Sequence, residues 1–387
     1  MQVALFMVAG CGAAAPQVAP VTTLRVPENG LQPQIAVDAT GVIHLIYYKG
    51  DPKAGDVFYV RSGDGGATFS LPLAVNSQAG SAIAVGNIRG AQLALGRNGR
   101  VYVAWNGSGT ALPKGPINPA LPADNPYRAS APMLYTRLND AGTAFEPQRN
   151  LMQFTYALDG GGSVAADGEG NVYVVWHAAA QGGQGEEDRK VWIARSTDEG
   201  QTFAREAQAW EKPTGACACC LAKVFTDSKG TVYIIYRAAE QKVNRDMYLL
   251  TSHDHGQTFE GTMVDQWKVS MCPMSSESFS ESPQGVLTAW ETKGQVRAAL
   301  VKTSRVVSAP GEARGRKHPV LASNAQGDFI LAWTEGMGWS RGGVVAWQVF
   351  DKAGEPLPNA GGRKEGVPVW SLVSAFTRTD GGFTVVY

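Results

Sequence analysis

The fold is decided by the stretch Ser196-Thr-Asp198-Glu-Gly200-Gln-Thr202-Phe203, because the chain repeats it. The other intact copies are Ser62-Gly-Asp64-Gly-Gly66-Ala-Thr68-Phe69 and Ser252-His-Asp254-His-Gly256-Gln-Thr258-Phe259, and a degenerate copy is Leu138-Asn-Asp140-Ala-Gly142-Thr-Ala144-Phe145. Asp and Ser side chains can bond turn amides, and glycine supplies a positive φ. Each copy therefore predicts a tight turn with a structural rather than a catalytic role.

A longer repeat surrounds these turns. A short apolar strand leads through a polar residue to a glycine, and a second apolar strand then ends in Trp or Tyr. The second strands are Gly41–Tyr47, Gly99–Trp105, Gly170–Trp176 and Gly230–Tyr236, with weaker copies at Gly285–Trp290, Gly327–Trp333 and Gly382–Tyr387. Such alternation around a glycine predicts β-hairpins. The glycines are 42 to 71 residues apart, a period that fits the four short strands of one propeller blade.

The Ser-x-Asp-x-Gly-x-Thr-Phe turns resemble the Asp-box of the sialidase-like β-propellers. The resemblance implies an all-β propeller of four-stranded blades, with six blades as the family's usual number. The repeats give seven second-strand signals, so six and seven blades both stay open. The segment Val21–Val26 is expected to complete the last blade from the N-terminal side and so protect its edge. Residues 21–387 are expected to form a single domain, with a long loop at Asn106–Pro132.

The first residues predict export. Residues 1–11 form a short apolar run that ends in Val8-Ala-Gly-Cys11 and resembles the lipobox of bacterial lipoproteins, although no Lys or Arg precedes it. The resemblance implies a signal peptide with a truncated start, lipidation at Cys11, a tether over 12–20, and a periplasmic or outer-membrane location. The alternative is a buried strand with an incidental cysteine. Apart from this anchor, no membrane segment is expected.

The balance of charged residues argues against nucleic acid as the binding partner. The 387 residues carry 34 Lys and Arg against 34 Asp and Glu, and a nucleic-acid binder would show a basic excess. Motifs for phosphate loops, dinucleotides, zinc proteases and serine hydrolases are absent from the sequence. We therefore expect a monomer that binds a glycan, a peptide or a protein partner.

The resemblance also raises the alternative of an exo-sialidase-like glycoside hydrolase. Such enzymes grip a carboxylate with arginines and use a Tyr/Glu pair and an Asp. Arg25 lies in Leu24-Arg25-Val26-Pro27, but this position is out of register with the first inner strand. Other strand-end candidates are interpreted as solvated rim charges: His177, Arg237, Glu240, Glu291 and Glu335. No catalytic residue is assigned.

The remaining cysteines form two motifs, Cys217-Ala-Cys219-Cys220 and Met271-Cys272-Pro-Met274. Each motif immediately precedes the inner strand of a repeat, in neighbouring blades, so both are expected on one face near the channel. Three interpretations stay open: disulfides, a soft-metal site for copper or zinc that includes the two methionines, and a redox-active thiol pair. His177, at the end of a strand in the third repeat, and His318, before the inner strand of the sixth, could join this rim, although neither spacing requires it.

Overall fold

The structure is a computed structural model that describes residues 20–387 except 120, 126–127, 130, 181, 184 and 304. Its strands form seven sheets. Within the described residues, no helix has the length and apolarity needed to cross a membrane. Cys11, the lipobox over 1–11 and the tether up to residue 19 lie outside the described residues.

In six of the seven sheets the strands follow one another in chain order. The first sheet contains β2 (Leu31–Val37), β3 (Ile43–Asp51), β4 (Ala54–Ser62) and β5 (Leu73–Ala74). The second contains β6 (Gln92–Leu95), β7 (Val101–Asn106), β8 (Met133–Arg137) and β9 (Arg149–Asn150). The third contains β10 (Ser163–Ala166), β11 (Val172–Ala178), β12 (Lys190–Ser196) and β13 (Ala207–Gln208). The fourth contains β14 (Lys223–Thr226), β15 (Val232–Arg237), β16 (Met247–Ser252) and β17 (Glu260–Asp265).

Three further sheets complete the chain. The fifth contains β18 (Ser278–Ser282), β19 (Gly285–Thr292), β20 (Gln295–Leu300) and β21 (Val306–Ser308). The sixth contains β22 (Arg316–Ser323), β23 (Phe329–Glu335), β24 (Gly343–Phe350) and β25 (Pro356–Val367). The seventh contains β26 (Ser374–Thr377), β27 (Phe383–Val386) and β1 (Thr22–Leu24). Three short 3-10 turns are η1 (Pro27–Asn29), η2 (Arg97–Gly99) and η3 (Glu186–Asp188).

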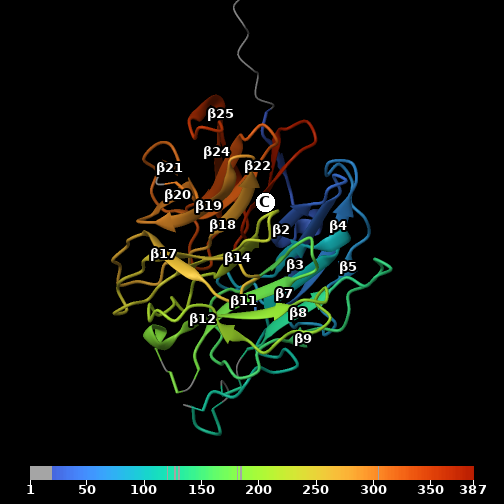
Figure 1. Cartoon of the computed structure of the whole chain (residues 1–387). Coiled ribbons are helices and arrows are strands. Elements are labelled where there is room, and N and C mark those ends of the chain that lie inside the picture. The colour runs from blue at the N-terminus through green and yellow to red at the C-terminus, as the bar shows by residue number, and fades with distance from the viewer. Residues whose placement is uncertain are drawn as a thin grey trace, which may run out of the picture.

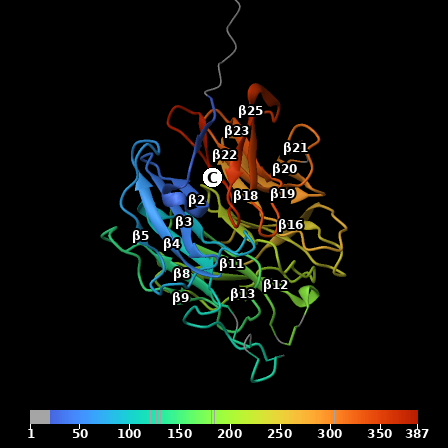
Figure 2. The same cartoon turned by 180° about the vertical axis from the view of Figure 1, so that it is seen from behind.

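The seven sheets are the blades of a propeller. Figures 1 and 2 show them following one another round a ring in chain order. The first strand of every blade lines one central cavity, so these strands are the innermost. The expected closure is confirmed, because β1 pairs in parallel with β27 and joins the N-terminal side of the chain to the last blade. Seven blades are therefore present rather than six.

The cores lie between neighbouring blades. Each second strand is buried almost throughout, and its terminal aromatic side chain is enclosed, as for Trp105, Trp176 and Trp290. One such core joins Tyr102 and Tyr135 of the second blade to Trp176 and Trp192 of the third. Burial of these large side chains is the main force that holds adjacent blades together.

Neighbouring strands within a blade are antiparallel, so the loops between them lie alternately on the two faces of the ring. The Ser-x-Asp turns join third to fourth strands on one face. In each, the serine accepts a bond from the glycine amide and donates to the aspartate, as at Ser196 Oγ, 2.9 Å from Gly200 N and 2.6 Å from Asp198 Oδ1. The same bonds recur at Ser62 and Ser252. The loops that enter the first strands, including both cysteine motifs, lie on the opposite face, here called the channel face.

Candidate functional site

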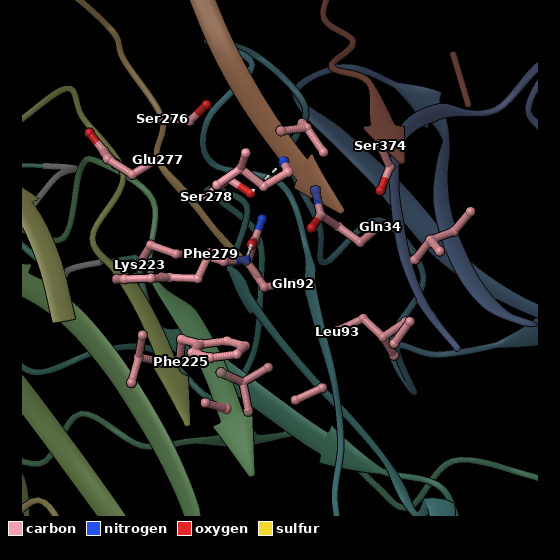
Figure 3. A pocket seen from close by; sticks show the side chains of 18 of the residues that line it. Gln34, Gln92, Leu93, Lys223, Phe225, Ser276, Glu277, Ser278, Phe279 and Ser374 are labelled. Atoms are coloured by element: carbon pink, nitrogen blue, oxygen red, sulfur yellow. Dashed lines mark hydrogen bonds between the residues drawn. The ribbon is translucent and has the colours of Figure 1, made fainter. Parts of the chain in front are cut away.

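The central channel is the hollow that the first strands of all seven blades share. Its cavity has a volume of about 320 Å³, at the lower end of the range of small-ligand pockets, roughly 300–1,000 Å³. Figure 3 shows polar side chains from several blades directed around this space. The polar lining residues are Gln34, Gln92, Lys223, Thr226, Ser276, Glu277, Ser278, His318 and Ser374.

Five of these residues occupy one equivalent position in their blades, seven residues before the turn glycine. They are Gln34, Gln92, Lys223, Ser278 and Ser374, before Gly41, Gly99, Gly230, Gly285 and Gly381. In the third blade, Ser163 holds this position but is buried and bonds to Ala222 O and Val224 N. The sixth blade places Val320 there. The repeat therefore builds a ring of polar side chains around the channel.

Lys223 supplies the cation of this ring. Its Nζ donates to Gln92 Oε1 at 2.6 Å, and no carboxylate of the described residues lies within ion-pair distance of it. Burial lowers the pKa of Lys223 to about 8, although the charge of Glu277 acts in the opposite direction. The ammonium therefore lies in the channel with an amide partner but no paired counter-ion.

Glu277 lies on the same wall with an incomplete set of partners. Its Oε1 is 3.4 Å from Ser275 Oγ, whereas its buried Oε2 has no hydrogen-bond partner. Burial raises the pKa of this carboxyl well above its usual range. Burial therefore favours the protonated form of this group, which can donate a hydrogen bond.

The mouth of the channel carries exposed aromatic surface. Trp339 is 60% exposed and packs edge-on against Trp370, with ring centroids 4.9 Å apart. These two rings, together with Met274 and His318, border a small hollow that shares His318 with the channel. An aromatic platform thus lies next to the polar ring.

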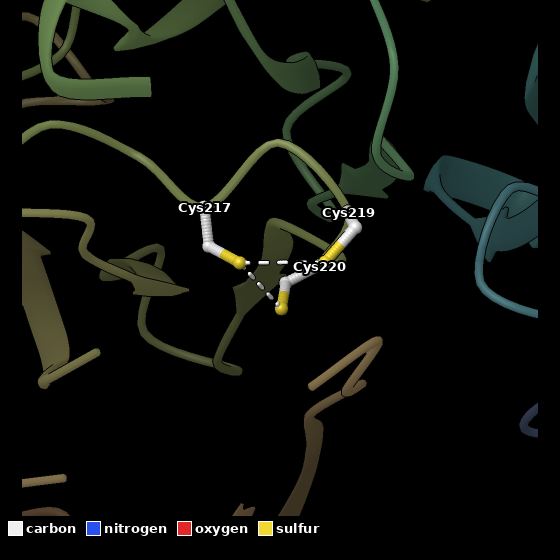
Figure 4. Close-up of side chains that lie close together, drawn as sticks. All are labelled: Cys217, Cys219 and Cys220. Atoms are coloured by element: carbon white, nitrogen blue, oxygen red, sulfur yellow. Dashed lines mark hydrogen bonds between the residues drawn. The ribbon is translucent and has the colours of Figure 1, made fainter. Parts of the chain in front are cut away.

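The cysteine motifs meet on the channel face, as expected from the repeat. Cys219 and Cys272 form a disulfide between the loops that precede β14 and β18. Cys217 and Cys220 remain buried thiols. Figure 4 shows the three sulfur-bearing side chains of the first motif turned toward one another. The Sγ atom of Cys217 lies 3.1 Å from that of Cys220 and 3.6 Å from that of Cys219.

The two methionines of the second motif differ in place. Met274 packs against Cys217, Cys219 and Cys220, whereas the Met271 side chain is 66% exposed. The three sulfurs of the first motif lie within 4.8 Å of one another and could together hold a metal ion. A site with all three thiolates would require reduction of the Cys219–Cys272 disulfide.

Comparison with known proteins identifies the fold. No protein-family model matches the chain, and no curated protein matches it. Among solved structures, an α-L-arabinanase of Penicillium chrysogenum in complex with arabinobiose is 14% identical with a TM-score of 0.55, over 88% of this chain and 100% of that one. The NanB sialidase of Streptococcus pneumoniae is 11% identical with a TM-score of 0.52, over 84% and 69%. An ulvan lyase from a new family of polysaccharide lyases is 12% identical with a TM-score of 0.52, over 93% and 87%. The chain has a sialidase-like β-propeller fold. At these identities the likeness shows the fold alone.

The channel of this sialidase-like propeller lacks the carboxylate grip of sialidases. Among the described residues that line it, there is neither an arginine nor a tyrosine, and Glu277 is the only carboxylate. Arg25 lies elsewhere, where it donates to Gly366 O and stacks over the ring of Tyr387. Hydrolysis of a glycoside normally requires two carboxyl groups flanking the bond, and this lining provides one.

Three strand-end residues that were predicted to be solvated are buried instead: His177, Arg237 and Glu291. Arg237 donates to Ser275 Oγ at 2.9 Å and to Arg245 O at 2.7 Å. The prediction failed because the partners come from other loops, whose proximity depends on the closed ring. Burial likewise raises the pKa of Glu291 to about 7. Glu240 is exposed, as expected.

Two of the predicted strand-end residues, His177 and Glu335, have structural partners. His177 Nε2 lies 2.9 Å from Cys220 O and its Nδ1 accepts from Arg189, while burial lowers its pKa to about 4. Glu335 accepts a hydrogen bond from the Trp333 indole at 2.9 Å. Neither residue lines the channel.

The sequence reasoning did not single out Lys223, Gln92 or Glu277. Lys223 and Gln92 could have been identified from the sequence, because both lie seven residues before the turn glycine of their repeat. In a propeller this position faces the axis, so a polar residue repeated there indicates a polar channel. Glu277 follows the second cysteine motif, but its burial depends on neighbouring blades.

Proposed function

We propose that this chain is a glycan-binding propeller that receives an acidic saccharide in its central channel. The observation that carries the proposal is the Lys223 ammonium, which projects into the channel without a paired carboxylate. A buried charge is costly until an opposite charge accompanies it. A sugar carboxylate would supply that charge.

The rest of the lining suits a sugar. Gln34, Gln92 and Ser374 offer donors and acceptors from separate blades, and Glu277 in its protonated form can donate to a carboxylate or hydroxyl oxygen. Trp339 and Trp370 at the mouth provide a surface for the apolar face of a further ring. Since only one carboxyl group lines the channel, the geometry favours binding over hydrolysis. The solved structures of similar fold include glycan-acting proteins, which supports a glycan rather than a peptide as the ligand.

The disulfide supports the compartment proposed from the first residues. Disulfides persist mainly in oxidising, extracytoplasmic environments, and Cys219–Cys272 joins two blades. We therefore place the propeller in the cell envelope, facing surface glycans, with the lipid anchor at Cys11 as a separate prediction.

The test is calorimetric titration with a trisaccharide of galacturonic acid and with its uncharged galactose counterpart. We expect the acidic ligand alone to bind, and Lys223→Met to weaken it about ten- to a hundredfold, the loss of one charge-assisted hydrogen bond. Lys190→Met is the matched control, because Lys190 makes the same bond to a glutamine, Gln208 Oε1, at 2.8 Å but is exposed. Equal binding of both sugars, or unchanged binding by Lys223→Met, would refute the proposal.

A further inference from the structure

The four cysteines of the channel face form two pairs at different depths. Cys272 is exposed and is bonded to Cys219, which is 7% exposed. Behind this disulfide lie Cys217 and Cys220, which are 0% and 1% exposed. The sulfurs therefore form a series that leads from solvent into the protein.

The spacing of the buried pair matches a redox motif. Cys217 and Cys220 are separated by two residues, the Cys-x-x-Cys spacing of thiol–disulfide oxidoreductases. The second intervening residue is Cys219, so the motif holds one end of the disulfide within itself. Exchange requires a thiolate next to a disulfide sulfur, and Cys217 Sγ lies 3.6 Å from Cys219 Sγ.

Two arginines lie beside the buried pair, and one of them, Arg245, is ion-paired with Glu186 at 2.6 Å. Ser275 Oγ bridges Arg237 Nε at 2.9 Å and Cys220 Sγ at 3.4 Å. Arg245, 5% exposed, leaves its Nε and Nη1 without a hydrogen-bond partner among the described residues. Buried donors without acceptors are costly, and a thiolate would offset that cost.

The two thiols have unequal acidity. Burial alone would raise the pKa of Cys220, but hydrogen bonds from Cys217 and Ser275 and the charge of Arg237 lower it to about 6. The shared hydrogen bond and burial raise the pKa of Cys217. The contact of 3.1 Å between their Sγ atoms lets Cys220, as a thiolate, accept the proton of Cys217.

We propose that the four cysteines form a thiol–disulfide exchange site, in which the buried Cys217/Cys220 pair reduces the Cys219–Cys272 disulfide and exposes Cys272 as a thiol. In the first step, Cys217 transfers its proton to Cys220 and attacks Cys219 Sγ. The Cys217–Cys219 bond forms, the Cys219–Cys272 bond breaks, and Cys272 leaves as a thiolate. In the second step, Cys220 gives its proton to Cys272 and attacks Cys217, which releases Cys219 as a thiolate.

The exchange neither gains nor loses electrons. One disulfide moves from the surface pair to the buried pair, while one proton and one negative charge pass to Cys219 and Cys272. The substrate class is a disulfide on another molecule. Cys272 would attack it and release one thiol, and Cys219 would then displace the second thiol and restore Cys219–Cys272.

The experiment is differential alkylation of the whole chain in a Cys11→Ser background. Folded protein is treated with iodoacetamide, unfolded and reduced, and treated with N-ethylmaleimide before peptide mapping. We expect iodoacetamide on Cys272 in the parent chain and its loss in Cys217→Ser. In Cys220→Ser, the first step loses its proton acceptor and is slower, while the second step is blocked. A Cys217–Cys219 disulfide should therefore accumulate on long incubation while Cys272 is still alkylated, and peptide mapping of a sample that is not reduced detects this disulfide.

Each variant is first checked for an unchanged circular dichroism spectrum. A partly unfolded variant would not form the Cys217–Cys219 disulfide selectively. Detection of this disulfide in Cys220→Ser therefore tests the exchange even if the substitution slightly lowers stability. An unreactive Cys272 in the parent chain would overturn the proposal. Stoichiometric copper or zinc held by Cys217 and Cys220 in the purified chain would overturn it as well.

Discussion

Replacing Lys223 by methionine should stabilise the unliganded protein while it weakens binding of the acidic ligand. The side chain is half-buried at the channel wall and has no paired carboxylate. The fall of its pKa from 10.5 to about 8 corresponds to roughly 3 kcal/mol at neutral pH, since each pKa unit is about 1.4 kcal/mol. Loss of the hydrogen bond to Gln92 offsets about 1 kcal/mol, and contact with channel water reduces the gain further. We expect Lys223→Met to be more stable by about 1–2 kcal/mol.

The stability difference between Lys223→Met and the wild type should depend on pH. The folded state binds the Lys223 proton less tightly than the unfolded state does, so the folding cost is fully present below pH 8. Between about pH 8 and 10.5 the unfolded chain holds more protons than the folded one, and the wild type gains stability as pH rises. The advantage of Lys223→Met should therefore be greatest near neutral pH and should disappear through this window.

The assay is thermal unfolding of both proteins at a series of pH values. A gain of this size in a chain of this length raises the melting temperature by about 2 °C. Lys190→Met, which removes an exposed lysine with the same kind of partner, should show no such gain. A Lys223→Met variant that is less stable at neutral pH, or a difference that does not change with pH, would refute the reasoning.

Three further perturbations test the fold. Ser196→Ala removes the acceptor of the Gly200 amide and should cost about 1–2 kcal/mol of unfolding free energy in urea, unless the turn amide finds water without loss. Cys272→Ser opens a loop of 53 residues and should cost up to about 4 kcal/mol under oxidising conditions; equal stability with the parent chain would argue against this pairing. Deletion of residues 20–26 exposes the edge of β27 by removing β1, so light scattering should detect self-association, and a monomer would contradict the role of β1 as closure.

The fold was predictable because short sequence patterns that recur along the chain specify its turns and hairpins. Each turn motif and each hairpin glycine specifies its own conformation from a few neighbouring residues, and seven copies fix the architecture. The pairing of Thr22–Leu24 with Phe383–Val386 was also predictable, because an incomplete last repeat needs a missing strand. The number of blades stayed open, since the resemblance and the repeats indicated different values.

The site was only partly predictable. The repeat places the two cysteine motifs on neighbouring loops, but four cysteines allow three pairings, and the choice of Cys219–Cys272 depends on how the loops pack. The burial of Arg237 and Glu277 depends on side chains from adjacent blades, which no local pattern encodes. Lys223 is an ordinary lysine in the sequence, and only closure of the ring gives it a desolvated position without a counter-ion.

The most direct test of the account is the proton taken up when an acidic saccharide binds. The trisaccharide of galacturonic acid is titrated at about pH 8.5 in two buffers of different ionisation enthalpy, where a carboxylate beside Lys223 should raise its pKa again. The account predicts net proton uptake by the wild type and by Lys190→Met, and weaker binding without proton uptake by Lys223→Met. Binding by the wild type without proton uptake, or equal binding by Lys223→Met, would contradict it.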